Sequence, residues 1–307
     1  MALVLIRRKC DGGGTYQSQR ALFERLLRST ADVISFISYW DLPYNNFNYS
    51  YIDVAVDKYG FCTLSIDRLG IGNSSIADPL QVIQAPAETS ALYEVTVMLR
   101  NGTVPNVPQA FEKVVHVGHS FGSVLTYDLV ARYPRASDGI ILTGYSQDGA
   151  FFFQTIADFN SKLARLNQPL RFGNISTTVV QQGLSMFIYP ELDSIKNYLS
   201  KHQITITKVE SVVQSTELGD LITGIYPTSL PQMQNLPTGY LTWSDAASNQ
   251  YAFLYPGFFD PRILNFAESV KMPYTIGELL TIGSSPKSTD FKGPVQILTG
   301  SKCSRSH

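Results

Sequence analysis

Residues 118–122 carry the pattern G-x-S-x-G, with Ser120 at its centre. A serine on a sharp turn between a strand and a helix exposes its Oγ, and glycines on both sides let the backbone crowd together without a Cβ clash. Ser120 is therefore the candidate nucleophile. The N–H of Phe121, at the start of the predicted helix, is the candidate donor to the oxyanion of a tetrahedral intermediate, with the helix dipole behind it.

The meaning of this pattern depends on its neighbours, because the same five residues also occur in ordinary loops. Residues 113–117 form a short β-branched run typical of a strand buried on both faces. Behind the turn, Val124 and Tyr127 share one helical stripe, which ends where Pro134 cannot continue a helix. The order of strand, tight turn and helix favours the catalytic interpretation.

A second motif, DRLGIGNSS at residues 67–75, follows a strand predicted at residues 61–66. Its glycines allow a close turn, and we interpret Asp67 as an acceptor for the amides of that turn rather than as a catalytic acid. Asp78 and the proline after it open a predicted helical region, which ends at Gly102. This helix is expected to return the chain to the central strand as a right-handed βαβ crossover.

Two more apolar runs, at residues 139–144 and 295–300, are expected to be strands of the same core. The segment between them far exceeds what a βαβ crossover needs, so it predicts an inserted cap. Its many aromatic side chains suit either a lid over a pocket for an apolar substrate or the core of the cap itself. The expected divisions are an irregular N-terminal segment (1–38), a core (39–150), the cap (151–285) and a last core strand with its tail (286–307).

The motifs at residues 67–75 and 114–123 resemble those of the α/β-hydrolase superfamily, in particular fungal proteins of the AB hydrolase-1 type. The resemblance covers roughly residues 39–300. It implies an α/β-hydrolase fold, a mostly parallel sheet flanked by helices with an inserted, mainly helical cap. It also implies a serine hydrolase of small apolar esters, lactones or amides, with an acyl-enzyme at Ser120 and one oxyanion N–H at Phe121.

Other parts of that family's catalytic machinery have no match in the sequence. The expected oxyanion His-Gly pair is replaced by ISFIS at residues 34–38, and neither an acid nor a last strand with a catalytic histidine follows Gly300. Asp148, shortly after the strand at residues 139–144, is an alternative acid, because triads are recognised by geometry rather than by position.

None of the four histidines is an obvious general base for Ser120. His116 is interpreted as a buried core residue with satisfied hydrogen bonds, and His119 as a strand-packing residue. His202 belongs to the cap, and His307 lies in the polar tail. Three interpretations stay open: a serine hydrolase that is impaired in this chain, a non-catalytic α/β-hydrolase scaffold or binding protein, and an incomplete gene model of an active hydrolase.

The amino-acid composition limits which classes of binding partner and cofactor are expected. The 307 residues hold 24 basic and 25 acidic side chains, a balance that gives no reason to expect nucleic acid or an anionic membrane. No apolar run reaches the ~18 residues of a membrane-spanning helix. The widely spaced cysteines and the absence of a metal-ligand cluster or phosphate-binding loop predict no metal and no cofactor.

Localisation and oligomeric state stay open. The sequence opens with the apolar run MALVLI, which is followed by Arg7 and Arg8. A secretory signal has the opposite order, although secreted relatives are possible. The expected partner is a small apolar substrate.

Overall fold

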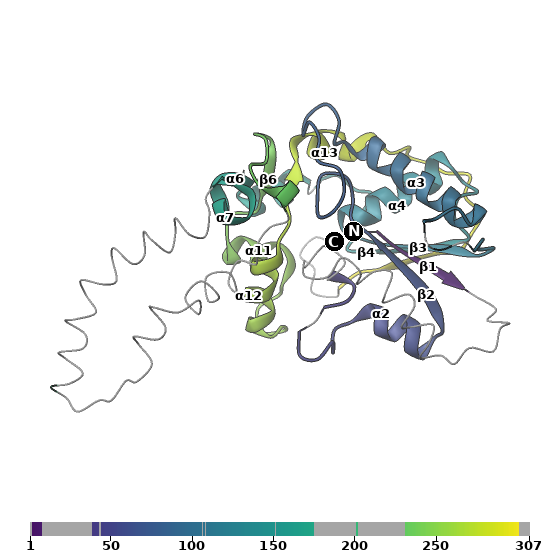
Figure 1. Cartoon of the computed structure of the whole chain (residues 1–307), viewed down its shortest axis with the longest axis horizontal. Coiled ribbons are helices and arrows are strands. Elements are labelled where there is room, and N and C mark those ends of the chain that lie inside the picture. The colour runs from purple at the N-terminus through teal and green to yellow at the C-terminus, as the bar shows by residue number, and fades with distance from the viewer. Residues whose placement is uncertain are drawn as a thin grey trace.

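The structure is a computed structural model, which describes residues 2–7, 39–42, 44–105, 107, 109–150, 152–174, 201 and 231–300. It is an α/β fold in which helices flank a sheet (Figure 1). The main sheet has five strands in the order β2-β1-β3-β4-β8. Their bounds are β1 Ala2–Arg7, β2 Phe61–Ile66, β3 Val114–His119, β4 Gly139–Thr143 and β8 Val295–Leu298.

The strands predicted at residues 61–66, 113–117, 139–144 and 295–300 are present, and all four run in the same direction. β3, β4 and β8 pair in parallel, in the register that aligns Val117 with Ile141 and Ile141 with Gln296. β1 pairs antiparallel with both β2 and β3, so β2 also runs parallel to β3. The carboxyl ends of β2, β3, β4 and β8 therefore share one edge of the sheet.

β1 corrects the expectation that residues 1–38 are irregular, at least for residues 2–7. It fills the space between β2 and β3, and its Val4 is fully buried against Leu99 and Val114. An unbroken apolar run does not alternate, so its sequence cannot show whether it is a central strand or another buried segment. Residues 8–38, the remainder of the segment expected to be irregular, lie outside the described residues.

Helices cover both faces of this sheet. Figure 1 shows α3 and α4 on one face and α2 on the other. The bounds are α2 Tyr51–Asp53, its π-helical continuation η2 Val54–Lys58, α3 Ala85–Asn101 and α4 Phe121–Arg132. On the α3 side, Leu99 packs on Val114, whereas on the α2 side Trp40 and Ala55 pack on Val117. Successive residues of β3 thus serve opposite faces, as the alternation of side chains along a strand requires.

The helix before β3 starts later than predicted. The helical region was expected from Asp78, but α3 begins at Ala85. Asp78 instead closes its own turn, because its carboxylate accepts the N–H groups of Leu80 (2.9 Å) and Gln81 (2.6 Å). The C-terminal end is as predicted: Gly102 has φ 68° and caps the helix in the left-handed conformation.

The segment between β4 and β8 forms a second group of short elements. Its strands β5, β6 and β7 make a small antiparallel sheet. Figure 1 shows α6, α7, α11 and α12 around it, and α13 beside α3. The bounds are α5 Phe152–Phe159, β5 Lys162–Leu163, α6 Ala164–Asn167, α7 Pro169–Phe172, η3 Pro231–Met233, β6 Tyr240–Thr242, α11 Ala246–Phe253, α12 Pro261–Val270, β7 Tyr274–Thr275, α13 Ile276–Thr281 and η4 Ile282–Ser284.

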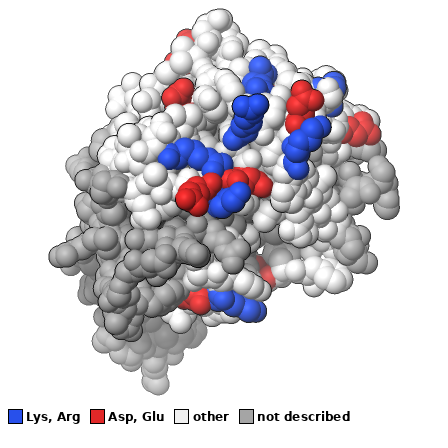
Figure 2. All heavy atoms as spheres, turned by 90° about the vertical axis from the view of Figure 1, so that its right-hand side faces the viewer, with Lys and Arg blue, Asp and Glu red and all other residues white. Residues whose placement is uncertain are grey.

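Figure 2 shows basic and acidic side chains next to one another on the face that it draws. The structure pairs several such groups across elements. Asp138 accepts from Arg100 at 2.6 Å, from Lys113 at 2.8 Å and from the N–H of Val114 at 2.9 Å. One carboxylate therefore ties the C-terminal end of α3 to the start of β3. In the described part of the chain, no helix is long and apolar enough to cross a bilayer.

Candidate functional site

Ser120 lies at the junction of β3 and α4, where the sequence predicted it. Its backbone has φ 52° and ψ −120°, a conformation that costs a non-glycine residue about 1–3 kcal/mol. Hydrogen bonds hold this geometry on both sides: the Ser120 N–H donates to Thr143 O (2.9 Å), and Ser120 O accepts from the Ser123 N–H (2.8 Å). The strand, tight turn and helix around Ser120 are confirmed.

Gly118 is required by the close approach of this turn to β3. A Cβ added at residue 118 would lie 2.4 Å from Gly122 O and 2.5 Å from Ser123 Cα. Both are backbone atoms that cannot swing away. The prediction that glycine lets the backbone crowd together is therefore confirmed at Gly118.

Replacing Gly118 by alanine is expected to lower the free energy of unfolding by about 1–3 kcal/mol, the usual cost of overpacking. Urea titration followed by circular dichroism measures this loss. Gly283→Ala is the matched control, because a Cβ there meets nothing within 4 Å. An equal loss in the two variants would show that the contact with Gly122 is not the cause.

Thr143, at the end of β4, organises the polar contacts behind the turn. Its Oγ1 donates its one proton to Gly118 O at 3.0 Å and lies 2.9 Å from His119 Nδ1. Because that proton is already used, His119 must donate from Nδ1. Burial lowers the pKa of His119 to about 4, so the ring is neutral at pH 7 and its Nε2 carries the lone pair.

The expected tautomer of His119 is therefore Nδ1–H rather than Nε2–H. Long-range ¹H–¹⁵N correlation spectra at pH 7 distinguish the two forms by the ¹⁵N shifts of each ring. Thr143→Val removes the hydroxyl acceptor and is expected to release this preference. An Nε2–H signal for His119 in the unmodified protein would contradict the assignment.

His116 is a satisfied core histidine, as predicted. It is fully buried, with Nε2 2.9 Å from Thr96 Oγ1 and Nδ1 2.8 Å from Ser137 Oγ. Both hydroxyls also have carbonyl acceptors, since Thr96 Oγ1 lies 2.7 Å from Leu92 O and Ser137 Oγ lies 2.7 Å from Gly139 O. A neutral His116 therefore donates to one of the two hydroxyls and accepts from the other, and the contacts allow either tautomer. Burial lowers the pKa of His116 to about 3. His116 is thus a neutral link between α3 and the start of β4.

In the part of the chain that the structure describes, no base forms a hydrogen bond with Ser120. Among the described residues, no group forms a hydrogen bond with Ser120 Oγ or with the N–H of Phe121. His119 stacks on Tyr39, with ring centroids 4.8 Å apart, and thus packs on the α2 side of the sheet. Asp148 is exposed and accepts the N–H of Ala150 at 2.9 Å, which makes it a turn residue. His202 and His307 lie outside the described residues.

The DRLGIG turn holds a buried charge cluster that the sequence analysis missed. Asp67 accepts the N–H of Asn73 at 3.1 Å, as predicted. The next residue, Arg68, forms ion pairs with Glu88 of α3 and Glu278 of α13, and its guanidinium lies 5.4 Å from the ring centroid of Phe121. The sequence carries no signal for this cluster, because its members are far apart in the chain.

A cavity of about 390 Å³ lies on the α2 side of the sheet. Its floor comes from β3, β4 and β8, and Tyr39, Trp40, Tyr49 and Tyr51 form its walls. Of the described residues that line it, none belongs to the segment 151–285, whose aromatic side chains the sequence analysis considered for a lid. Several of these instead pack on one another, such as Trp243 on Phe253.

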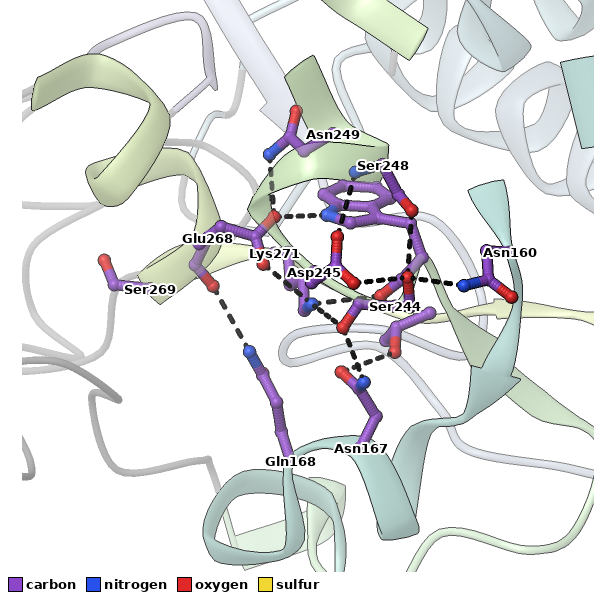
Figure 3. Close-up of polar contacts among 12 residues, drawn as sticks. Asn160, Asn167, Gln168, Ser244, Asp245, Ser248, Asn249, Glu268, Ser269 and Lys271 are labelled. Carbon is purple, nitrogen blue, oxygen red and sulfur yellow. Dashed lines mark hydrogen bonds and ion pairs between the residues drawn. The ribbon is translucent and has the colours of Figure 1, made fainter. Parts of the chain in front are cut away.

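Figure 3 shows a polar network inside the segment 151–285. Glu268 accepts from Trp243 Nε1 and Asn249 (2.9 Å), and from the buried Lys271 (2.9 Å). Lys271 also donates to Trp243 O at 3.0 Å, and burial lowers its pKa. Because protein groups satisfy these charges, the network joins β6, α11 and α12 as a structural unit rather than as a ligand site.

Comparisons with protein-family models, with curated proteins and with solved structures found no match. In the described ranges, no three His, Cys, Asp or Glu side chains are grouped so that they could hold a metal ion. The resemblance to the α/β-hydrolase superfamily therefore rests on the motifs around Asp67 and Ser120 and on the geometry of the turn that carries Ser120.

Proposed function

We propose that this chain has the α/β-hydrolase fold, with residues 151–285 as its cap, and that Ser120 is its nucleophile. The observation that carries the proposal is the backbone of Ser120, held at φ 52° between β3 and α4. Glycine would adopt this conformation without strain, whereas serine adopts it at a cost in free energy. A function of the serine hydroxyl would account for a serine at this strained position. Strained residues of this kind cluster at functional sites.

The proposed reaction is acyl transfer. Ser120 Oγ attacks the carbonyl carbon of an ester, lactone or amide and gives its proton to water, which later returns a proton to the leaving group, while the carbonyl oxygen becomes an oxyanion. The N–H of Phe121, in the first turn of α4, would donate to that oxyanion, and the helix dipole adds to the stabilisation. Collapse of this intermediate expels the alcohol or amine and leaves an acyl-enzyme, which water hydrolyses.

Turnover is expected to be slow. In the described part of the chain, both histidines are committed to other contacts, and neither forms a hydrogen bond with Ser120. Enzymes of this type that lose one triad member retain only about 10³–10⁴-fold acceleration over water. Activated esters, whose leaving group needs no proton, are therefore the substrates on which activity is expected to be seen.

The test combines a fluorophosphonate probe with p-nitrophenyl esters on the full chain. We expect the probe to label the protein slowly at Ser120, because no described group activates the hydroxyl, and turnover of the activated p-nitrophenyl esters to rise only slightly above background. Ser120→Ala should abolish labelling. Ser90→Ala, on the exposed side of α3, should leave it unchanged.

Two outcomes would contradict this proposal. Rapid turnover that Ser120→Ala abolishes would show that a base serves Ser120 after all, and the chain is then a competent hydrolase. Labelling that Ser120→Ala does not affect would favour the second candidate, a non-catalytic α/β-hydrolase scaffold. The observation that favours this alternative is that the described histidines form hydrogen bonds with Thr96, Ser137 and Thr143 rather than with Ser120.

A further inference from the structure

The geometry points to Arg68 as a positioning residue for the reaction at Ser120. Its guanidinium lies 5.4 Å from the ring centroid of Phe121, within the range of a cation–π contact. The N–H of the same Phe121 is the proposed oxyanion donor, so the inference rests on the proposed function. It goes further by connecting the segment 151–285 to that reaction, because α13 supplies one of the groups that hold Arg68.

Phe121 is the residue that has to be held in place. It is the first residue of α4, and among the described residues its N–H forms no hydrogen bond. The direction of this N–H therefore depends on the turn at Ser120 and on the packing of the Phe121 side chain. An oxyanion donor stabilises the transition state most when it is already oriented before the reaction. A contact that fixes the ring of Phe121 thus helps to fix the donor.

Arg68 is itself held by three groups from different parts of the chain. Its Nη1 forms ion pairs with Glu88 of α3, at 3.4 Å, and with Glu278 of α13. Its Nη2 donates to Pro273 O at 3.0 Å. A planar guanidinium can make several such contacts at once and still stack on an aromatic ring. The ring of Phe121 therefore meets a cation whose position is fixed.

The turn that carries Arg68 is also fixed. The N–H of Gly70 donates to Ser75 O at 2.9 Å and closes the turn after β2. Gly70 has φ 81°, and a Cβ at this residue would lie 3.3 Å from the ring of Tyr240 in β6. The turn is thus packed against the segment 151–285, which leaves Arg68 little freedom to move away from α4.

α13 connects the segment 151–285 to the same point. Figure 1 shows α13 beside α3, and the N–H of Gly277 in α13 donates to Pro79 O, before α3, at 2.7 Å. This bond docks the start of α13 on the core. The next residue, Glu278, is 2% exposed and forms its ion pair with Arg68 from this docked position. One end of the segment is therefore linked through a single guanidinium to the turn that carries the proposed nucleophile.

The test is a double-variant cycle on the full chain, read as the rate at which a fluorophosphonate labels Ser120. Arg68→Lys keeps the charge that the two carboxylates need, but a compact ammonium cannot make all the contacts of the guanidinium. Phe121→Leu removes the ring and keeps the N–H. Arg68→Lys is expected to slow labelling about 3–10-fold when Phe121 is present, and less than about 2-fold when combined with Phe121→Leu. A general loss of stability would slow labelling equally in both cases.

A second measurement does not require any reaction. In protein labelled with ¹⁵N-phenylalanine, Phe121→Leu assigns the amide signal of Phe121, and Arg68→Lys is expected to shift that signal. Arg262→Lys is the matched control, because the guanidinium of Arg262 also pairs with a carboxylate, Asp260, and lies 5.9 Å from a ring centroid, that of Tyr44. This control should change neither the amide signal nor the labelling rate.

The two measurements separate this inference from the proposed function. If the unmodified protein is not labelled at Ser120, the proposed function fails and this role of Arg68 fails with it. If labelling occurs but Arg68→Lys leaves its rate unchanged, or slows it equally with and without the Phe121 ring, only the inference is overturned. A Phe121 amide signal that does not respond to Arg68→Lys would overturn it as well.

Discussion

Replacement of Arg68 by methionine is expected to lower the free energy of unfolding by about 3–5 kcal/mol, because it leaves two buried carboxylates without their counter-charge. Glu88 is 3% exposed and Glu278 is 2% exposed, and both form ion pairs with Arg68. Methionine keeps much of the volume of arginine but none of its charge. Urea titration at pH 7.5 measures the loss.

The protonation state of Glu88 makes the destabilisation by Arg68→Met depend on pH. Burial raises the pKa of Glu88 to about 7, although Arg68 opposes the shift. A carboxylate that is nearly neutral at pH 6 needs its partner less, so the penalty of Arg68→Met should shrink between pH 8 and pH 6. Adding Glu88→Gln to Arg68→Met should recover part of the lost stability, because it removes one of the orphaned charges.

Arg262→Met is the matched control, because its ion pair with Asp260 involves an arginine that is largely exposed. It is expected to change stability little. A loss from Arg68→Met no larger than that of Arg262→Met would show that the Arg68 cluster is solvated in solution. Since the guanidinium of Arg68 lies over the ring of Phe121, the same variant should also slow labelling of Ser120.

Acidification from pH 6.5 to pH 4.5 is expected to lower the free energy of unfolding by roughly 1.4 kcal/mol per pH unit. His116 and His119 have pKa values of about 3 and about 4 in the folded protein, against about 6.5 when unfolded. Their depressed pKa values stabilise the fold fully above pH 6.5. That stability is lost as the pH falls, because only the unfolded chain takes up the two protons.

Glu88 acts in the opposite direction in the same window. Its folded pKa of about 7 lies above its unfolded value, so the folded state binds the proton first and gains stability as the pH falls toward 4.5. Two protons taken up by the unfolded state against one by the folded state leave a net uptake of about one proton on unfolding. This net uptake of about one proton gives the predicted slope of the free energy of unfolding, roughly 1.4 kcal/mol per pH unit.

The measurement is the urea midpoint and slope at half-unit steps of pH, kept at or above pH 4.5 to limit the titration of ordinary carboxylates. His116→Gln retains a donor and an acceptor but not the titration, so its stability should be nearly flat across the window. If the unmodified protein is itself flat, the two histidines are not held neutral by burial. If His116→Gln keeps the full slope, another group is responsible.

Much of the candidate site could be predicted from the sequence, because its signals are local. The strands β2, β3, β4 and β8 and the helix α4 are each recognisable from short patterns. Glycine and proline mark where the chain must turn, as at Gly102 and Gly118. Ser120 was found because its motif and the two elements that position it lie within a few residues of one another.

The remaining features of the fold and of the site are decided only by the tertiary structure. The place of β1 between β2 and β3, the cluster of Arg68 with Glu88 and Glu278, and the cavity beside Trp40 all join segments that are distant in the chain. The protonation of His119 likewise depends on Thr143 of the neighbouring strand. A periodic pattern reports which face of an element is buried, but not which element covers it. The partners, and with them the charges and the cavity, are fixed only when the strands take their order in the sheet.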